Sequence, residues 1–229
     1  MFEPKIKLNR LEFDEKDILR YEQQPIEEGL IMFYGSSCFT RWSEHRNNPS
    51  LEKEILRKDG SRAIVNHGFG TSTVEELLYY YPRLVRPWKP RAMVITCYLN
   101  DYTYNYSVEE VMFLLKRLLE YARTDMPGIR FYLADIHHTT NHIDEKEKWS
   151  PFKHYRKQIN AELKAYCEAH DDCTYLCHAD FPLFYEKAED VGDYDKVRRD
   201  LFVEDKVHYT PEGYQIYKEF YRQALDEIL

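Results

Sequence analysis

Several polar residues that lie far apart in the sequence could together carry out acyl transfer. Ser37 follows Leu30–Tyr34, an apolar run that is typical of a strand buried on both faces. A serine hydroxyl is a poor nucleophile until a base accepts its proton, and His208 could be that base. Asp205, three residues before the histidine, could accept the other imidazole N–H and fix its tautomer. These residue types and this spacing predict a serine–histidine–aspartate site.

The tetrahedral intermediate of acyl transfer also needs hydrogen-bond donors that face its negative oxygen. Our candidates are the backbone N–H of Ser37, a backbone N–H near Gly70 and the side-chain amide of Asn100. Gly70 lies in a loop after the second predicted strand, and Asn100 follows the third. Because ligand sites of open α/β sheets form at the carboxyl ends of the strands, we expect these groups to meet at one edge.

The elements that must position these groups alternate along the chain. The sequence predicts strands over residues 30–34, 62–66, 91–98, 129–136 and 173–177, and a short helix near residues 14–24. Two capping boxes, Thr73-Val-Glu-Glu76 and Ser107-Val-Glu-Glu110, open helices, and Thr210-Pro211 opens the last one. Because strands and helices alternate, we expect one α/β domain over residues 1–229, with a mostly parallel sheet and helices on both of its faces. We expect residues 1–29 to form an N-terminal extension that packs on this domain.

The segment from His137 to Ser150 is polar and long for a connection, which suggests a lid or a substrate loop before a helix over residues 151–170. Two groups of residues raise the possibility of a metal site, but neither has the spacing of a zinc site. We therefore predict no metal and no cofactor, with the cysteines of the second group as small apolar residues. The two groups are Asp135, His137, His138, His142 and Asp144, and Cys167, His170, Cys173, Cys177 and His178.

Composition narrows the classes of function. A net charge of -8 argues against nucleic-acid binding, which needs a basic surface, and 43% hydrophobic residues supply a full core. The sequence shows no apolar stretch long enough to span a membrane and no signal-peptide pattern, so we expect no membrane partner. Five cysteines, an odd number without a CxxC pair, favour a reducing, cytoplasmic setting.

Four motifs in order resemble the blocks of the GDSL/SGNH hydrolases, from about residue 30 to the end of the chain. They are Gly35-Ser36-Ser37, Asn66-His-Gly-Phe-Gly70, Leu99-Asn100-Asp101 and Asp205-Lys-Val-His208. The resemblance implies a flavodoxin-like three-layer α/β/α sandwich with a five-stranded sheet, and acyl-ester hydrolysis without a metal. It also implies Ser37 as nucleophile, Asp205 and His208 as its partners, and Gly70 and Asn100 as oxyanion donors beside the Ser37 N–H.

Some choices stay open at the level of sequence. Many relatives have a second glycine where this chain has Thr71, so the oxyanion N–H could belong to Thr71 instead of Gly70. The third block usually has glycine at the position of Tyr98, and the tyrosine could narrow the pocket. Ser36 is the alternative nucleophile. The tyrosines near the motifs either rim the pocket or are ordinary core and surface residues; they are Tyr79, Tyr80, Tyr81, Tyr98, Tyr102, Tyr104 and Tyr106.

The function that fits these observations is a serine hydrolase, with a small-molecule acyl ester as its partner. An esterase or a carbohydrate O-deacetylase is our first hypothesis, and a lysophospholipase, a thioesterase or an acyltransferase is an alternative. A rival from another class is a non-catalytic ligand-binding module on the same fold, which predicts that at least one catalytic group is missing or displaced. The sequence leaves the oligomeric state open.

Overall fold

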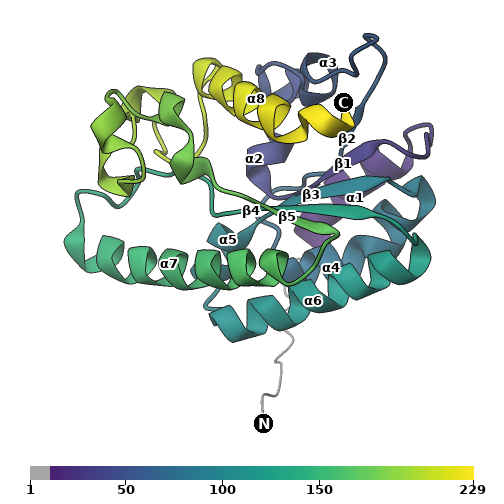
Figure 1. Ribbon diagram of the computed structural model, residues 1–229, viewed down its shortest axis with the longest axis horizontal. Coiled ribbons are helices and arrows are strands. Elements are labelled where there is room, and N and C mark those ends of the chain that lie inside the picture. Colours follow the sequence, from purple (N-terminus) through teal and green to yellow (C-terminus); the bar gives the residue numbers. More distant parts are fainter. Residues whose placement is uncertain (1–10) are drawn as a thin grey trace.

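A five-stranded, all-parallel sheet lies at the centre of the computed structural model, which describes residues 11–229 (Figure 1). Its strand order, β2-β1-β3-β4-β5, is that of flavodoxin-like folds, so the predicted fold class is confirmed. The strands are β1 (Ile31–Gly35), β2 (Ile64–Asn66), β3 (Ala92–Thr96), β4 (Arg130–Ala134) and β5 (Cys173–Leu176).

Strand β1 is an inner strand, paired in parallel with β2 on one side and β3 on the other. All five of its residues are buried, as expected for a strand covered on both faces. Successive side chains point to opposite faces, so Met32 and Tyr34 enter one core cluster while Ile31 and Phe33 enter the other. The apolar run before Ser37 therefore anchors that serine between two packed layers.

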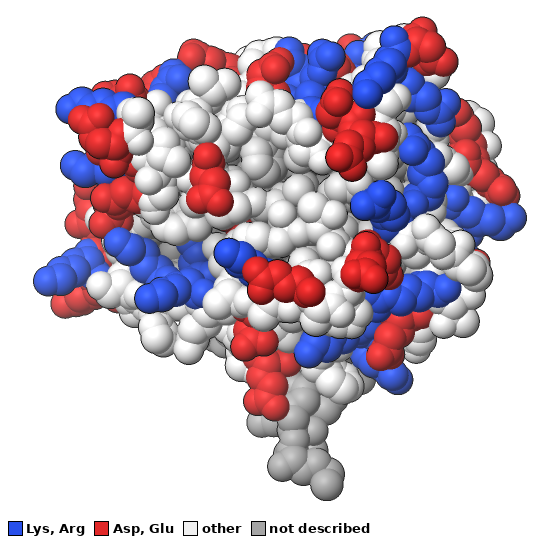
Figure 2. Space-filling view, viewed as in Figure 1, with Lys and Arg blue, Asp and Glu red and all other residues white. Residues whose placement is uncertain are grey.

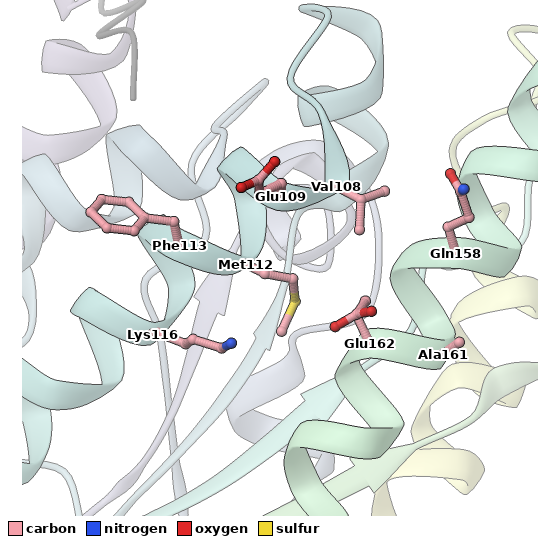
Figure 3. A pocket seen from close by; sticks show the side chains of 8 residues that line it. All are labelled: Val108, Glu109, Met112, Phe113, Lys116, Gln158, Ala161 and Glu162. Carbon is pink, nitrogen blue, oxygen red and sulfur yellow. The ribbon is translucent and has the colours of Figure 1, made fainter. Parts of the chain in front are cut away.

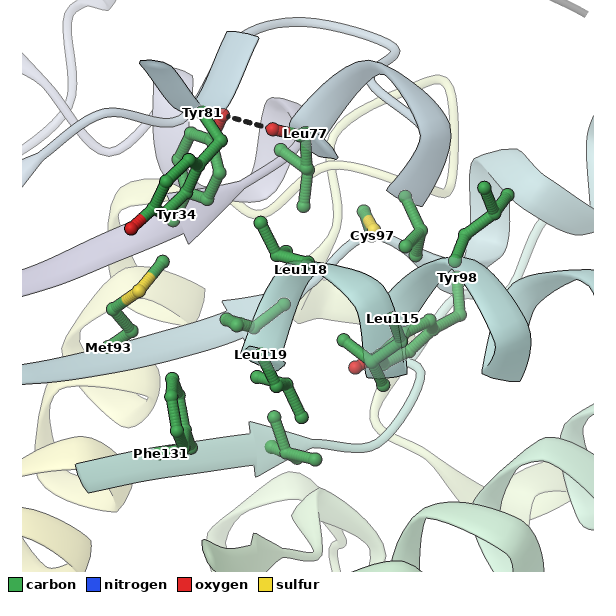
Figure 4. Close-up of a cluster of buried hydrophobic side chains, with 14 of the residues drawn as sticks. Tyr34, Leu77, Tyr81, Met93, Cys97, Tyr98, Leu115, Leu118, Leu119 and Phe131 are labelled. Atoms are coloured by element: carbon green, nitrogen blue, oxygen red, sulfur yellow. Dashed lines mark hydrogen bonds between the residues drawn. The ribbon is translucent and has the colours of Figure 1, made fainter. Parts of the chain in front are cut away.

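Three long helices cover one face of the sheet: α4 (Val74–Leu84), α6 (Val108–Asp125) and α7 (Lys146–Glu168). Both predicted capping boxes are present, at the first residues of α4 and α6. Figure 4 shows part of this core, in which Leu115, Leu118 and Leu119 of α6 lie among side chains of the sheet. A long apolar stripe at helical spacing thus fixes α6 against the strands.

The opposite face carries α8 (Pro211–Leu225) with two short helices, α2 (Ser37–Thr40) and α3 (Leu51–Glu54) (Figure 1). Thr210 caps α8, as predicted, by accepting a hydrogen bond from the Gly213 N–H at 3.2 Å. Trp42, just after α2, stacks on Tyr214 of α8 with 5.5 Å between ring centroids. Helix α8 is thereby fixed next to the segment that follows Ser37.

The N-terminal helix α1 (Leu11–Glu22) packs against α4. Arg83 of α4 donates hydrogen bonds to both Glu15 and Glu22, at 2.7–3.0 Å. Within residues 11–229, the remaining elements are α5 (Tyr98–Thr103) and eight 3₁₀ turns. The turns are η1 (Glu44–Arg46), η2 (Arg86–Trp88), η3 (His178–Asp180), η4 (Pro182–Phe184), η5 (Ala188–Asp190), η6 (Tyr194–Lys196), η7 (Arg199–Leu201) and η8 (Asp226–Ile228). Residues 1–10 of the predicted extension lie outside the described part of the chain.

Several predicted boundaries were wrong. Helix α7 begins at Lys146, so the loop expected to reach Ser150 is shorter, and Pro151 lies inside the helix. Pro151 is the sixth residue of this helix, and because it has no backbone N–H the helix lacks one hydrogen bond near its start. The third strand ends at Thr96, since Tyr98 already belongs to α5.

Positive and negative side chains are intermixed over the face in Figure 2, around a largely uncharged centre. In residues 11–229, no helix is both long and apolar enough to cross a membrane. All five cysteines are free thiols, and four of them are buried.

The loop after β2 contains two glycines whose surroundings differ. A Cβ on Gly68 would lie 2.5 Å from the Phe39 Cβ and 2.9 Å from the Thr40 backbone nitrogen, whereas a Cβ on Gly70 would meet nothing within 4 Å. We expect Gly68→Ala to lower the free energy of unfolding by about 1–3 kcal/mol, because it overpacks this contact. We expect Gly70→Ala to change it by less than about 0.5 kcal/mol. Urea unfolding of both variants tests this, and equal losses would contradict the close approach at Gly68.

Candidate active site

Ser37 is the first residue of α2, directly beyond the carboxyl end of β1. Its side chain is half-buried, and its backbone N–H has no hydrogen-bond partner among the described residues, as is usual for the first turn of a helix. Gly35 makes the position possible, since a Cβ there would lie 2.2 Å from the Thr96 carbonyl oxygen of β3. The strand, the glycine and the helix start together fix where the serine hydroxyl lies.

Ser36, the alternative nucleophile, occupies a different environment. It is 1% exposed, and its hydroxyl lies 3.8 Å from the sulfur of Cys38. Its carbonyl oxygen accepts hydrogen bonds from the backbone N–H groups of Phe39 and Thr40. Ser36 is therefore part of the core beneath α2, while Ser37 faces the other predicted groups.

The structure brings Ser37, His208 and Asp205 into one continuous hydrogen-bonded chain. The His208 Nε2 lies 2.8 Å from the Ser37 Oγ, and the His208 Nδ1 lies 2.7 Å from the Asp205 Oδ2. The other carboxylate oxygen, Oδ1, accepts the backbone N–H groups of Val207 and His208, each at 2.9 Å. With Nδ1–H donating to the carboxylate, Nε2 is left to accept the serine proton.

The electrostatics of the two partners favour a neutral imidazole beside an ionised carboxylate. Burial lowers the pKa of His208 below its usual value and the positive charge of Arg41 acts in the same direction, while the hydrogen bond to Asp205 opposes both. Burial alone would raise the pKa of Asp205, but the hydrogen bonds from the His208 backbone and ring and from Val207 outweigh it, so the net shift is downward. A neutral histidine is the form that can accept a proton.

The loop from β2 to α4 carries both candidates, Gly70 and Thr71, for one of the predicted donors. Neither the Gly70 nor the Thr71 backbone N–H has a hydrogen-bond partner among the described residues, so both alternatives remain. Thr71 has a φ of 61°, in the left-handed region that favours glycine. A glycine would adopt this conformation without strain. The Gly70 φ is not in that region.

Asn100 lies in α5, and its side-chain nitrogen donates one hydrogen bond to the Ser72 carbonyl oxygen at 2.9 Å. Its second amide hydrogen remains for another acceptor. Ser72 in turn donates from its hydroxyl to the Gly35 carbonyl oxygen at 3.0 Å. The amide is thus tied to the loop of Gly70 and, through that loop, to the end of β1.

Sequence reasoning missed the residue that fastens α5 to α4. Asp101 is fully buried, and its Oδ1 accepts the backbone N–H of Val74 at 3.0 Å. Burial raises the pKa of this carboxyl to about 8. The sequence feature that could have revealed Asp101 is its position directly after Asn100, in a motif where only the asparagine had been assigned a role.

The first residues of the segment after β4 are buried and do not form the open, polar loop that the sequence suggests. Residues 137–140 are buried, and the backbone N–H of Thr140 donates to the Lys206 carbonyl oxygen at 2.8 Å. The guanidinium of Arg156, from α7, donates to the His137 carbonyl oxygen at 2.7 Å. This segment therefore supports the turn that carries Asp205 and His208.

The remaining candidates are placed as follows. The part of the chain that the structure describes holds no cluster of three or more His, Cys, Asp or Glu side chains suited to a metal ion. Of the tyrosines near the motifs, Tyr80, Tyr81, Tyr98 and Tyr106 are core residues, whereas Tyr79 is 49% exposed.

A hollow of about 780 Å³ lies between α6 and α7 (Figure 3). None of the predicted site residues lines it. Its lining residues are Val108, Glu109, Met112, Phe113, Lys116, Gln158, Ala161 and Glu162.

Solved structures similar to this chain share its fold across most of its length. A Streptococcus pneumoniae protein provisionally described as a platelet activating factor is 17% identical, with a TM-score of 0.71 and 94% of each chain covered. A GDSL-like lipase from Bacteroides thetaiotaomicron is 18% identical, with a TM-score of 0.69, and covers 94% of this chain and 98% of its own. A variant of a Geobacillus acetyl-xylooligosaccharide esterase is 13% identical, with a TM-score of 0.60, covering 87% and 95%.

These identities are too low to show more than the fold. No curated protein matches the sequence significantly. The sequence model of one family, however, matches residues 33–216, a span that begins in β1 before Ser37, ends in α8 beyond His208, and contains all four motifs. The chain belongs to the GDSL-like lipase/acylhydrolase family.

Proposed function

We propose that this protein is a serine hydrolase that cleaves small acyl esters. The observation that carries the proposal is the hydrogen-bonded chain from the Ser37 hydroxyl through the His208 ring to the Asp205 carboxylate, with contacts of 2.8 and 2.7 Å. These distances lie within the range that general-base activation of a nucleophile requires. A non-catalytic binding module would have lost or displaced one of these groups, and all of them are present and in contact.

The proposed reaction has two halves. In the first, His208 Nε2 accepts the Ser37 proton while Oγ attacks the carbonyl carbon, and the same proton then passes to the alcohol oxygen as its bond to the acyl carbon breaks. In the second, His208 takes a proton from water as the hydroxide attacks the acyl-serine. It then returns that proton to the Ser37 oxygen as the bond to the acyl carbon breaks, which releases the carboxylic acid and restores free Ser37 and neutral His208. Asp205 keeps the imidazole in the required tautomer and stabilises its charged form in both halves.

Three donors are proposed to hold the oxyanion in each half. They are the Ser37 N–H, an N–H of the loop at Gly70 or Thr71, and the free amide hydrogen of Asn100. Such donors act strongly because they are fixed before the charge develops. Acetylated carbohydrates are among the substrates to test, because a protein of similar fold is an acetyl-xylooligosaccharide esterase.

Ser37→Ala should abolish both labelling by a fluorophosphonate probe and turnover of p-nitrophenyl acetate, lowering kcat at least about 10³-fold. Ser36→Ala is the matched control, since that neighbouring hydroxyl lies in the core, and it should keep both activities. Gel fluorescence and absorbance measure the two readouts. Equal labelling and equal turnover in wild type and Ser37→Ala would eliminate the assignment of the nucleophile.

Asn100→Ala should lower kcat for the same ester by about 10²–10³, because one oxyanion donor is lost. Circular dichroism and urea unfolding distinguish this loss from a failure to fold, since Asn100 also bonds to Ser72. If the folded variant keeps the kcat of the wild type, Asn100 is not an oxyanion donor.

The dependence of kcat/KM on pH should report the free imidazole of His208. Activity requires the neutral form, and the pKa of His208 lies below its usual value, so kcat/KM should stay high below pH 6.5 and fall only as the pH drops through the lowered pKa. Steady-state kinetics on an ester with a pH-insensitive leaving group measures the profile. If the acid-side loss of kcat/KM had its midpoint above about pH 7, the proposed environment of His208 would be contradicted.

A further inference from the structure

Arg41 is the charged residue that lies beside the nucleophile on the same short helix. It caps α2 in a helical conformation, and its backbone N–H donates to the Ser37 carbonyl oxygen at 2.9 Å. Residues four apart on a helix share a face, with about 5–6 Å between their Cβ atoms. The Arg41 side chain is 43% exposed, so an approaching substrate can reach it.

The guanidinium of Arg41 donates no hydrogen bond to any described residue. Its nearest carboxylate oxygen is Oδ2 of Asp205, 3.9 Å from Nη1, which is beyond hydrogen-bond distance. Other arginines of this protein are used differently. Arg83, Arg123 and Arg199 each donate two or more hydrogen bonds to carboxylates.

Asp205 is a poor partner for Arg41, because its carboxylate oxygens already have other donors. Oδ1 accepts two backbone N–H groups, and Oδ2 accepts the imidazole of His208. The residues on either side of Asp205 are both exposed; Glu204 is negative and Lys206 is positive, so their charges offset each other. A fork of five N–H donors, suited to binding planar oxyanions, therefore remains open next to Ser37.

We propose that Arg41 binds an anionic group of the substrate, a carboxylate or a phosphate, so that the preferred substrates are anionic acyl esters. This inference rests on the proposed function and names the substrate class of the same site. A charged ester gains charge-assisted hydrogen bonds that a neutral ester of the same shape cannot make. The side chain is partly exposed, so salt screens part of the gain.

The test compares pairs of esters in which one member carries an anionic group and the other carries the same group as a neutral methyl ester. In the acyl group, p-nitrophenyl hydrogen succinate is paired with its methyl ester. In the alcohol, p-acetoxybenzoate is paired with methyl p-acetoxybenzoate, and p-acetoxyphenyl phosphate with its dimethyl ester. The two alcohol pairs separate a carboxylate from a phosphate, and the acyl pair shows on which side of the ester the anion lies.

The measured quantity is the ratio of kcat/KM for the charged ester to that for its neutral partner. For at least one pair, Arg41→Gln should lower this ratio by about 5- to 20-fold, the effect of losing one or two charge-assisted hydrogen bonds at a partly exposed site. Arg41→Lys should restore part of the ratio. The wild-type ratio should also fall as ionic strength rises.

Arg222→Gln is the matched control, because Arg222 is an exposed arginine in the last turn of α8. Arg222 comes fourteen residues after His208. It lies eleven residues beyond Pro211, the first residue of α8, which places it about 16 Å along the helix from that end. This variant should keep the ratios of the wild type. The same loss in Arg222→Gln would mean that the ratio reports net charge instead of a contact at Arg41.

A ratio that Arg41→Gln leaves unchanged for every pair would overturn the inference. Equal losses for charged and neutral esters, with a pH profile shifted upward, would also overturn it, because Arg41 would then act only through Asp205 and His208. In both results the neutral esters are still hydrolysed by the wild type, so the proposed function survives. If the wild type hydrolyses no ester at all, the proposed function is wrong, and the inference about Arg41 is wrong as well because it rests on that function.

Discussion

The contact between Ser37 and His208 joins residues that are 171 positions apart, and the arrangement of the site depends on it. The serine is held by β1, an inner strand buried on both faces, and the histidine by a turn just before α8. A hydrogen bond of this kind tolerates only a few tenths of an ångström of misplacement before it weakens. The fold must therefore fix the turn as firmly as it fixes the strand.

The turn is held from several directions. The Asp205 carboxylate accepts two backbone N–H groups inside it, and the Val203 N–H donates to the His208 carbonyl oxygen at 2.8 Å. From outside the turn, the Thr140 N–H donates to the carbonyl oxygen of Lys206. The segment of Thr140 is held in turn by Arg156, which is buried and donates to the His137 carbonyl oxygen. The Arg156 guanidinium lies 4.3 Å from the Tyr194 ring centroid, and this contact offsets part of the cost of burying its charge.

The parts that sequence alone predicted are those with local signatures. The apolar run of β1, the two capping boxes and the Asp205-x-x-His208 spacing each depend on residues close together in the chain. They sufficed for the fold class, and they named the residues that the structure brings into contact. The start of α7 was missed because Pro151 suggests a helix boundary, whereas the burial of Trp149 and Phe152 on either side of it stabilises the helix there.

Contacts between distant segments left no comparable signal. Nothing local to Thr140 or Arg156 points to the turn of Asp205, because both residues donate to backbone carbonyl oxygens of segments that lie far away in the sequence. Arg41 could have been found from its spacing of four residues after Ser37, but its lack of a partner is visible only in three dimensions. The choice between Gly70 and Thr71 as donor depends on backbone direction, which residue types alone do not determine.

Locating the acyl group during turnover tests the central claim most directly. The protein would be mixed with an ester whose acyl group leaves slowly, quenched in acid within the first turnover, digested and analysed by tandem mass spectrometry. The account predicts one acyl group, on the peptide that contains Gly35-Ser36-Ser37, with the modification on Ser37. An acyl group on another residue, or turnover with no acylated peptide at any quench time, would contradict it.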